Sequence, residues 1–260
     1  MKLNITQIPE IRPNQDGWFY ETGTGPTLIN KVYSVATTGI QAAIGRFYPY
    51  EYKENSDPAI RSMQKRVANG GAQLGGNDVY KFIEEISRNS PVNHMTCFYF
   101  QAGVSIQTLT LNEIKQNIDQ ASKHFNLTLP ICIPINFGAF GVFERNHIAS
   151  IIIKDNVVDY NDSKGVLSKN KPLKDDHNLQ DILEYCREKF TNEGDIAENP
   201  YIHQYDCHNC GVFVCRHIYS KIHQDQLMGT MDTNAPSLGE IQNFRVLINQ
   251  IAYEGEETAL

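Results

Sequence analysis

The stretch HIASIIIKDNVVDYND, residues 147–162, constrains the fold of this chain more than any other. Two runs rich in β-branched residues flank the dipeptide Asp155-Asn156, and such a dipeptide favours a two-residue hairpin turn. The stretch therefore predicts two antiparallel strands. The position of the turn decides which residues of the two strands face each other.

The register of this hairpin selects one acidic residue as the neighbour of a histidine. With this turn, Asp162 lies opposite Ala149 and diagonal to His147 on the same face of the sheet, within reach of a side-chain hydrogen bond. Asp159 instead pairs with Ile152 and points to the other face. Because a slip of one residue would reverse the choice, the predicted pairing of His147 with Asp162 depends on the turn.

The remaining sequence mixes helical and extended patterns without strict strand–helix–strand repetition, which favours an α+β fold with a central mixed sheet flanked by helices. One helical segment opens with Thr110 and Glu113, the spacing of a capping box. We expect helices over residues 77–86, 110–125, 178–190, 211–222 and 241–254, and strands over 95–100, 129–136, 147–153 and 157–160. Residues 1–70, rich in Gly, Pro, Thr and Asn, indicate irregular structure or a small appended layer.

The composition narrows the classes of function. The chain has 260 residues, 41% of them hydrophobic, and a net charge of −7. This acidic balance argues against a nucleic-acid binder, because there is no basic stripe to replace phosphate counterions. We expect no secretory signal peptide and no membrane span, since no apolar run reaches the ~20 residues that a span needs. Six cysteines without the spacing of a disulfide-rich mini-protein indicate a reducing, cytoplasmic compartment.

The segment HQYDCHNCGVFVCRH, residues 203–217, holds three cysteines and three histidines in fifteen positions. A structural zinc site normally takes its four ligands from two separated pairs. Here the residues from 211 onward look like a buried helix, which would carry Cys215 away from Cys210. We therefore expect no metal and no other cofactor. Four cysteines lie in apolar runs typical of buried, inert thiols: Cys97, Cys132, Cys186 and Cys215.

Cys210 differs, because it ends a polar loop and begins the apolar helix. A helix N-terminus lowers the pKa of a thiol, since its unpaired N–H groups and the helix dipole favour the thiolate. The same N–H groups can hold a developing oxyanion, and the amide of Gln204 can point at that oxyanion too. Gly211 would let a substrate backbone approach closely. With His147 as base and Asp162 as its orienting group, the sequence predicts nucleophilic catalysis by a thiol.

Together these residues resemble the Ulp/SENP-type cysteine proteases of clan CE, whose catalytic residues run in the order His, Asp, Gln, Cys. The family pattern of PI, HW, YYDS and Q-x5-C-G is similar to IPIN, HI, DYNDS and QYDCHNCGVFVC in this chain. Weaker similarities, such as LGGNDVYKFI to the WLND helix of the family, extend the resemblance over residues 72–254. The chain departs from the family at Ile148, where Trp is usual, at Asn209, where Asp is usual, and before the Asn-Asp helix, where a Trp is missing.

The resemblance implies an Ulp/SENP-like, papain-like fold, with residues 71–260 as the protease domain and residues 1–70 as an extension that frames the substrate surface. It implies four site residues: Cys210 as nucleophile, His147 as general base, Asp162 as its orienter, and Gln204 in the oxyanion hole. The substrate would be a protein conjugated to ubiquitin or a ubiquitin-like modifier, cut after the C-terminal Gly-Gly of the modifier. The acidic tail YEGEETAL and the divergence resemble bacterial deubiquitinase effectors, which a type IV secretion system delivers into a host cell.

Two other functions remain open from the sequence. Acetyltransferases of the same clan keep the Gln-to-Cys spacing, but typically have a Glu as the acid and a basic inositol-phosphate site, whereas this chain has Asp162 and little basic sequence beyond KNKPLK. The third possibility is a diverged protein that binds a ubiquitin-like partner without catalysis, because of Ile148 and Asn209. Cys207 is a rival nucleophile, but it lacks the following glycine and helix.

Overall fold

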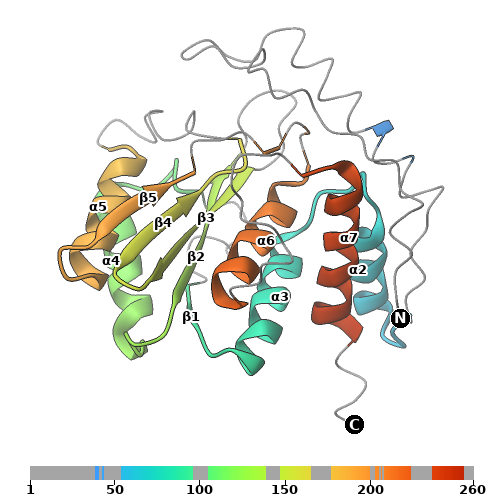
Figure 1. The fold of residues 1–260 in the computed structure, drawn as a ribbon, viewed down its shortest axis with the longest axis horizontal. Helices are drawn as coiled ribbons and strands as arrows, with labels where there is room; N and C mark the ends of the chain where they lie inside the picture. The colour runs from blue at the N-terminus through green and yellow to red at the C-terminus, as the bar shows by residue number, and fades with distance from the viewer. Residues whose placement is uncertain are drawn as a thin grey trace, which may run out of the picture.

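The computed structural model describes residues 39–40, 43, 54–95, 105–138, 147–164, 177–199, 203–204, 206, 208–223 and 236–254. In these ranges the chain forms a five-stranded mixed sheet with helices on both faces (Figure 1), in strand order β1-β2-β3-β4-β5. The expected α+β class is therefore confirmed.

The sheet is antiparallel at its centre and parallel at its two edges. The three expected strands in its middle are confirmed. The short edge strand β5 was not expected, because its four residues show no apolar alternation. The expected strand over 95–100 lies outside the described residues beyond Met95. The strands are β1 (Asn93–His94), β2 (Ile131–Gly138), β3 (His147–Lys154), β4 (Val157–Asn161) and β5 (Asp195–Glu198).

The hairpin between β3 and β4 has the predicted register. Asp155 and Asn156 both have positive φ, 50° and 65°, as a two-residue turn of this kind requires. Ile152 pairs with Asp159, and the ladder ends at the pair of Ser150 with Asn161. The next residue of β3 toward its start, Ala149, is therefore level with Asp162, as expected.

Each face of the sheet has its own apolar core, because side chains along β3 alternate between the two faces. Ile151 and Ile153 belong to the core under α4 and α5, whereas Ile148 and Ile152 belong to the core shared with α3, α6 and α7. Figure 1 shows α4 and α5 on one side of the sheet and α6 on the other. The helices are α3 (Gly76–Asn89), α4 (Leu111–Ala121), α5 (Leu179–Phe190), α6 (Cys210–His223) and α7 (Leu238–Asn249), which continues into a π-helical turn, η5 (Gln250–Glu254).

One helix lies within the segment for which we expected irregular structure or a small appended layer. α2 (Pro58–Ala68) begins with Asp57, whose side chain accepts a hydrogen bond from the N–H of Ala59, and with a proline at its first position. Its Val67 is fully buried in the core shared with α3 and α6. Irregular structure was the wrong alternative for these residues, because the cap and the proline favour a helix; the domain boundary at residue 70 stays a prediction.

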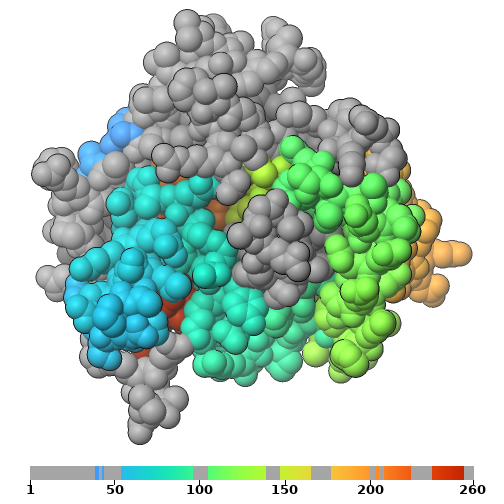
Figure 2. Space-filling model, turned by 180° about the vertical axis from the view of Figure 1, so that it is seen from behind, coloured from blue at the N-terminus to red at the C-terminus, as the bar shows by residue number. Residues whose placement is uncertain are grey.

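The opposite side of the molecule presents α2 and α3 at one end of the face and α4 at the other (Figure 2). None of the helices in the described ranges is long and apolar enough to cross a membrane.

Candidate active site

The first residue of β3, His147, is hydrogen-bonded to Asp162 just after β4. Its Nε2 lies 2.8 Å from Oδ1 of Asp162, and both side chains are buried. The carboxylate also accepts the main-chain N–H of Lys164 at 2.8 Å and the hydroxyl of Tyr160 at 3.3 Å. The imidazole is thus held by a carboxylate that two further donors hold in place, an arrangement that orients a histidine.

Cys210 is the first residue of α6, and its sulfur faces His147. Since Nε2 of His147 is bonded to Asp162, Nδ1 is the ring nitrogen left for the sulfur. Burial by itself raises the pKa of the Cys210 thiol, but the hydrogen bond and charge of His147, and the main-chain N–H of Ile148, lower it overall. Cys210 is 2% exposed, so it lies under covering groups.

The other buried thiols behave differently. Burial raises the pKa of Cys132 to about 12, and burial together with the charge of Asp78 raises that of Cys215. Both are buried cysteines that form no disulfide, as is Cys186. The prediction of buried thiols is confirmed for these three, while Cys97 lies outside the described residues. Among these thiols, Cys210 is the one whose pKa is lowered, which favours the thiolate form.

His147 complements this thiol electrostatically. Burial lowers its pKa, but the charge and hydrogen bond of Asp162, followed by the hydrogen bond and charge of Cys210, raise it to about 9. A raised histidine pKa beside a lowered thiol pKa favours an imidazolium–thiolate pair at neutral pH. Such a pair attacks carbonyl carbon without first needing a base to remove its proton.

The start of α6 is organised by the buried carboxylate of Asp206. Its Oδ1 accepts the main-chain N–H groups of His208 and Asn209 at 2.9 and 2.7 Å, and its Oδ2 accepts the Asn209 amide at 2.9 Å. Burial raises the pKa of Asp206, but the charge of His208 and these hydrogen bonds lower it overall. The loop before Cys210 is therefore held by a charged carboxylate that satisfies donors at the helix start.

Gln204 lies in this loop with its amide turned toward the loop itself. Its Nε2 donates to the main-chain oxygen and Oδ1 of Asp206, at 3.0 and 3.1 Å, and its Oε1 accepts the hydroxyl of Ser163 at 2.6 Å. The main-chain oxygen of Ser163 accepts the N–H groups of His203 and Gln204. These bonds join the segment after Asp162 to the loop before Cys210. The role of Gln204 at an oxyanion stays a prediction.

Gly211 has a packing role instead of the expected role in substrate approach. A Cβ at this position would lie 3.0 Å from Cβ of Leu74 and 3.5 Å from side-chain atoms of Val79 and Ile148. The glycine thus faces the protein interior, where it lets the loop before α3 lie directly against α6. The expectation was wrong because it considered the position in the sequence but not the direction in which a side chain would point.

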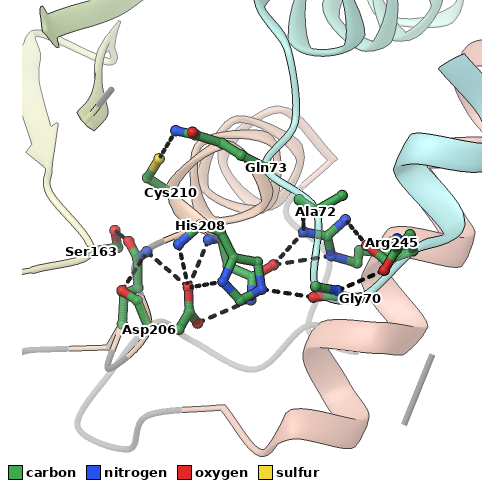
Figure 3. Close-up of polar contacts among 12 residues, drawn as sticks. Gly70, Ala72, Gln73, Ser163, Asp206, His208, Cys210 and Arg245 are labelled. Carbon is green, nitrogen blue, oxygen red and sulfur yellow. Dashed lines mark hydrogen bonds and ion pairs between the residues drawn. The ribbon is translucent and has the colours of Figure 1, made fainter. Parts of the chain in front are cut away.

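Two further residues at the site were missed in the sequence. Gln73, in the loop between α2 and α3, places its amide Nε2 3.6 Å from the sulfur of Cys210 (Figure 3). Arg245 of α7 is fully buried and donates to Asn209 and to three main-chain oxygens. The sequence holds little signal for either, although an arginine among the apolar residues of FRVLINQI marks a buried charge.

A second Ser-His-Asp group lies elsewhere, between β3, β4 and α6. Nδ1 of His217 is 2.7 Å from the hydroxyl of Ser150, and its Nε2 is 3.6 Å from Asp159, which also pairs with Lys221. Ser150 is fully buried and lies in the middle of a strand, so it has no helix N-terminus beside it. We interpret this group as a set of structural contacts that hold α6 against the sheet.

No group of three or more His, Cys, Asp or Glu side chains is placed to hold a metal ion within the described ranges. Cys207 lies outside those ranges.

Comparison with known proteins gives matches in structure but not in sequence. No family model matches the chain, and no curated protein matches it. In structure the chain is similar to the SUMO protease Ulp1, solved with its catalytic cysteine oxidised to a sulfinic acid, at 18% identity and a TM-score of 0.49 over 84% of this chain and 94% of that one. It is also similar to the Chlamydia trachomatis effector protein ChlaDUB1, at 10% identity and a TM-score of 0.46 over 79% and 96%. These likenesses concern the fold alone.

Proposed function

We propose that the protein is a thiol isopeptidase that removes ubiquitin or a ubiquitin-like modifier from other proteins. The observation that carries the proposal is the buried arrangement of Cys210, His147 and Asp162, in which a thiol of lowered pKa faces a histidine held by a carboxylate. A merely structural cysteine needs neither a lowered pKa nor such a partner.

The chemistry follows from this arrangement. The Cys210 thiolate attacks the carbonyl carbon at the end of the modifier, and the carbonyl π electrons move onto oxygen. When that carbonyl re-forms, the bond to the lysine nitrogen breaks and the His147 imidazolium gives its proton to the leaving amine. His147 then takes a proton from water, which attacks the thioester and releases the modifier and the thiolate.

Substrate entry has a steric requirement. Cys210 is 2% exposed, so an extended peptide reaches its sulfur only after covering groups move. The Gly-Gly end that we propose as the substrate suits a buried sulfur, because glycine has no side chain to collide with the covering groups.

We also propose that the protein acts in a host cell as a translocated bacterial effector, supported by the resemblance of its tail to type IV secretion signals.

Asp162 in the acid position favours hydrolysis over the acetyltransferase alternative, whose members typically use a glutamate.

The test is to incubate wild type and Cys210→Ala with a panel of modifier propargylamide probes and to read the adducts by intact mass. We expect one covalent adduct of wild type with at least one modifier and none with the variant. Absence of any adduct with wild type would refute the isopeptidase, and turnover of acetyl-CoA would favour the transferase.

A further inference from the structure

Gln73 brings a side-chain amide to the reactive sulfur from a part of the chain that is 137 residues away. It lies in the loop between α2 and α3, and its Nε2 is 3.6 Å from Sγ of Cys210 (Figure 3). An amide N–H at this distance donates to a thiolate, as hydrogen bonds to sulfur are longer than those to oxygen. The residue therefore touches the atom that reacts.

Gln204, the glutamine expected at the oxyanion, is engaged elsewhere. Its amide nitrogen donates twice to Asp206, and its amide oxygen accepts the hydroxyl of Ser163. The amide cannot be reversed without placing its oxygen against two oxygens of Asp206. To reach an oxyanion, Gln204 would have to release hydrogen bonds to a buried carboxylate, which is costly.

The loop that carries Gln73 is held rigidly by the same network that holds the helix of Cys210. Arg245 donates to the main-chain oxygens of Asn69 at 3.0 Å and Ala72 at 2.5 Å, and Nε2 of His208 lies 2.7 Å from the oxygen of Gly70. On the other side of Gln73, Leu74 is buried against Gly211. Preorganised donors of this kind stabilise a developing charge most, because they need not reorient during the reaction.

We infer that Gln73 is a catalytic residue: its amide donates to the Cys210 thiolate and then to the oxyanion that forms when the thiolate attacks a carbonyl. The identity of the natural substrate in this inference rests on the proposed function. The role of Gln73 in the reaction of the thiol does not. In the attack, the Sγ–C bond forms while the carbonyl π pair moves onto oxygen. That oxygen accepts the N–H of Gln73, until the C=O bond re-forms and the leaving group departs. The oxyanion forms on the carbon that is bonded to Sγ, so it lies close to the amide nitrogen of Gln73, which carries two N–H groups.

Two small reagents distinguish an effect of Gln73 on the oxyanion from an effect on the thiolate. Iodoacetamide alkylates a thiolate by displacement at a saturated carbon, so no oxyanion forms. p-Nitrophenyl acetate acylates the same thiolate through a tetrahedral oxyanion. Both rates are measured for Cys210 from about pH 5 to about pH 10, with the modified peptide identified by mass, and are compared on the plateau where the thiol is ionised.

For Gln73→Ala we expect the plateau acylation rate to fall by roughly 100-fold, as on loss of one oxyanion donor. The plateau alkylation rate should change by less than about 3-fold, while its midpoint moves to higher pH because the thiolate loses a donor. Gln73→Glu keeps the length of the side chain but removes the N–H groups, so Cys210 in this variant should be acylated at least as slowly as in Gln73→Ala. Gln116→Ala, the same change at an exposed position of α4, serves as the matched control and should leave both rates unchanged.

Unchanged acylation in Gln73→Ala, or an equal fall of both plateau rates, would overturn the role at the oxyanion. Thermal unfolding of each variant identifies any loss that comes from misfolding. If the modifier probes label wild type but acylation does not depend on Gln73, the proposed function stands and this inference fails. If no modifier probe reacts and the selective loss of acylation is observed, the proposed function fails and Gln73 keeps its role.

Discussion

Arg245 of α7 donates from Nε and Nη2 to Oδ1 of Asn209, at 3.0 and 2.6 Å, and Asn209 directly precedes Cys210. The amide nitrogen of Asn209 donates to Oδ2 of Asp206 at 2.9 Å. A neutral asparagine thus connects a buried cation to a buried anion at the start of the helix that carries Cys210. Asp206 explains why residue 209 is an asparagine where the family pattern usually has an aspartate. An aspartate at this position would bring two carboxylates together.

Replacing Arg245 should destabilise the protein strongly. Arg245→Met takes the charge of Arg245 away from the neighbourhood of Asp206 and removes a donor from Asn209 and from three main-chain oxygens. We expect the free energy of unfolding to fall by about 3–5 kcal/mol, the usual result of removing one partner of a buried charge network. Urea unfolding measures this change in the free energy of unfolding. Arg88→Met is the control, because Arg88 is exposed and its pairing with Glu85 is worth about 1 kcal/mol or less. Equal losses in the two variants would contradict this reading.

Asn209→Asp should weaken the protein in a pH-dependent way. The new carboxylate lies beside that of Asp206, so one of the two must have a raised pKa in the folded state. A carboxyl group with a raised folded pKa lowers stability above that pKa, and the loss disappears as the pH falls below its unfolded value of about 4. We therefore expect the variant to be less stable than wild type at neutral pH and to approach it in acid. A constant difference across pH would argue against this explanation.

The charge of His147 should depend on Asp162. The pKa of His147 is raised to about 9, so its charged form stabilises the fold fully below its unfolded pKa of about 6.5, and this contribution is lost as the pH rises through about 9. In Asp162→Asn the largest favourable partner is gone, so the pKa of His147 falls and this dependence on pH weakens. The thiolate of Cys210 loses part of its counter-charge, so the midpoint of its iodoacetamide alkylation moves to higher pH. The alkylation profile measures this directly, and a midpoint equal to that of wild type would show that Asp162 does not support the pair.

The group of Ser150, His217 and Asp159 should act in stability and not in catalysis. Burial raises the pKa of Asp159, but the hydrogen bond and charge of His217 and then of Lys221 lower it to about 2, as in a structural ion pair. Ser150→Ala removes the partner of Nδ1 of His217 in the interior and should cost about 1–3 kcal/mol of unfolding free energy. Its reaction with modifier probes should equal that of wild type. Loss of labelling in a variant that melts normally would give this group a functional role.

The sequence could predict the hairpin and its acidic partner because both depend on local rules. A two-residue turn at Asp155-Asn156 determines the register, and the alternation of side chains along a strand then separates Asp162 from Asp159. The same locality explains the capped helices, such as the one that begins after Thr110. Cys210 could be placed at a helix start for the same reason.

The tertiary structure alone decided which further groups surround the start of α6. Gln73 and Arg245 reach the site from segments 137 and 36 residues away from their partners Cys210 and Asn209. It also turned Gln204 toward Asp206 and Gly211 toward Leu74. A single sequence specifies periodicity and turns within a segment, whereas the direction of a loop side chain is set by the packing of distant segments and by the need of buried polar groups for partners.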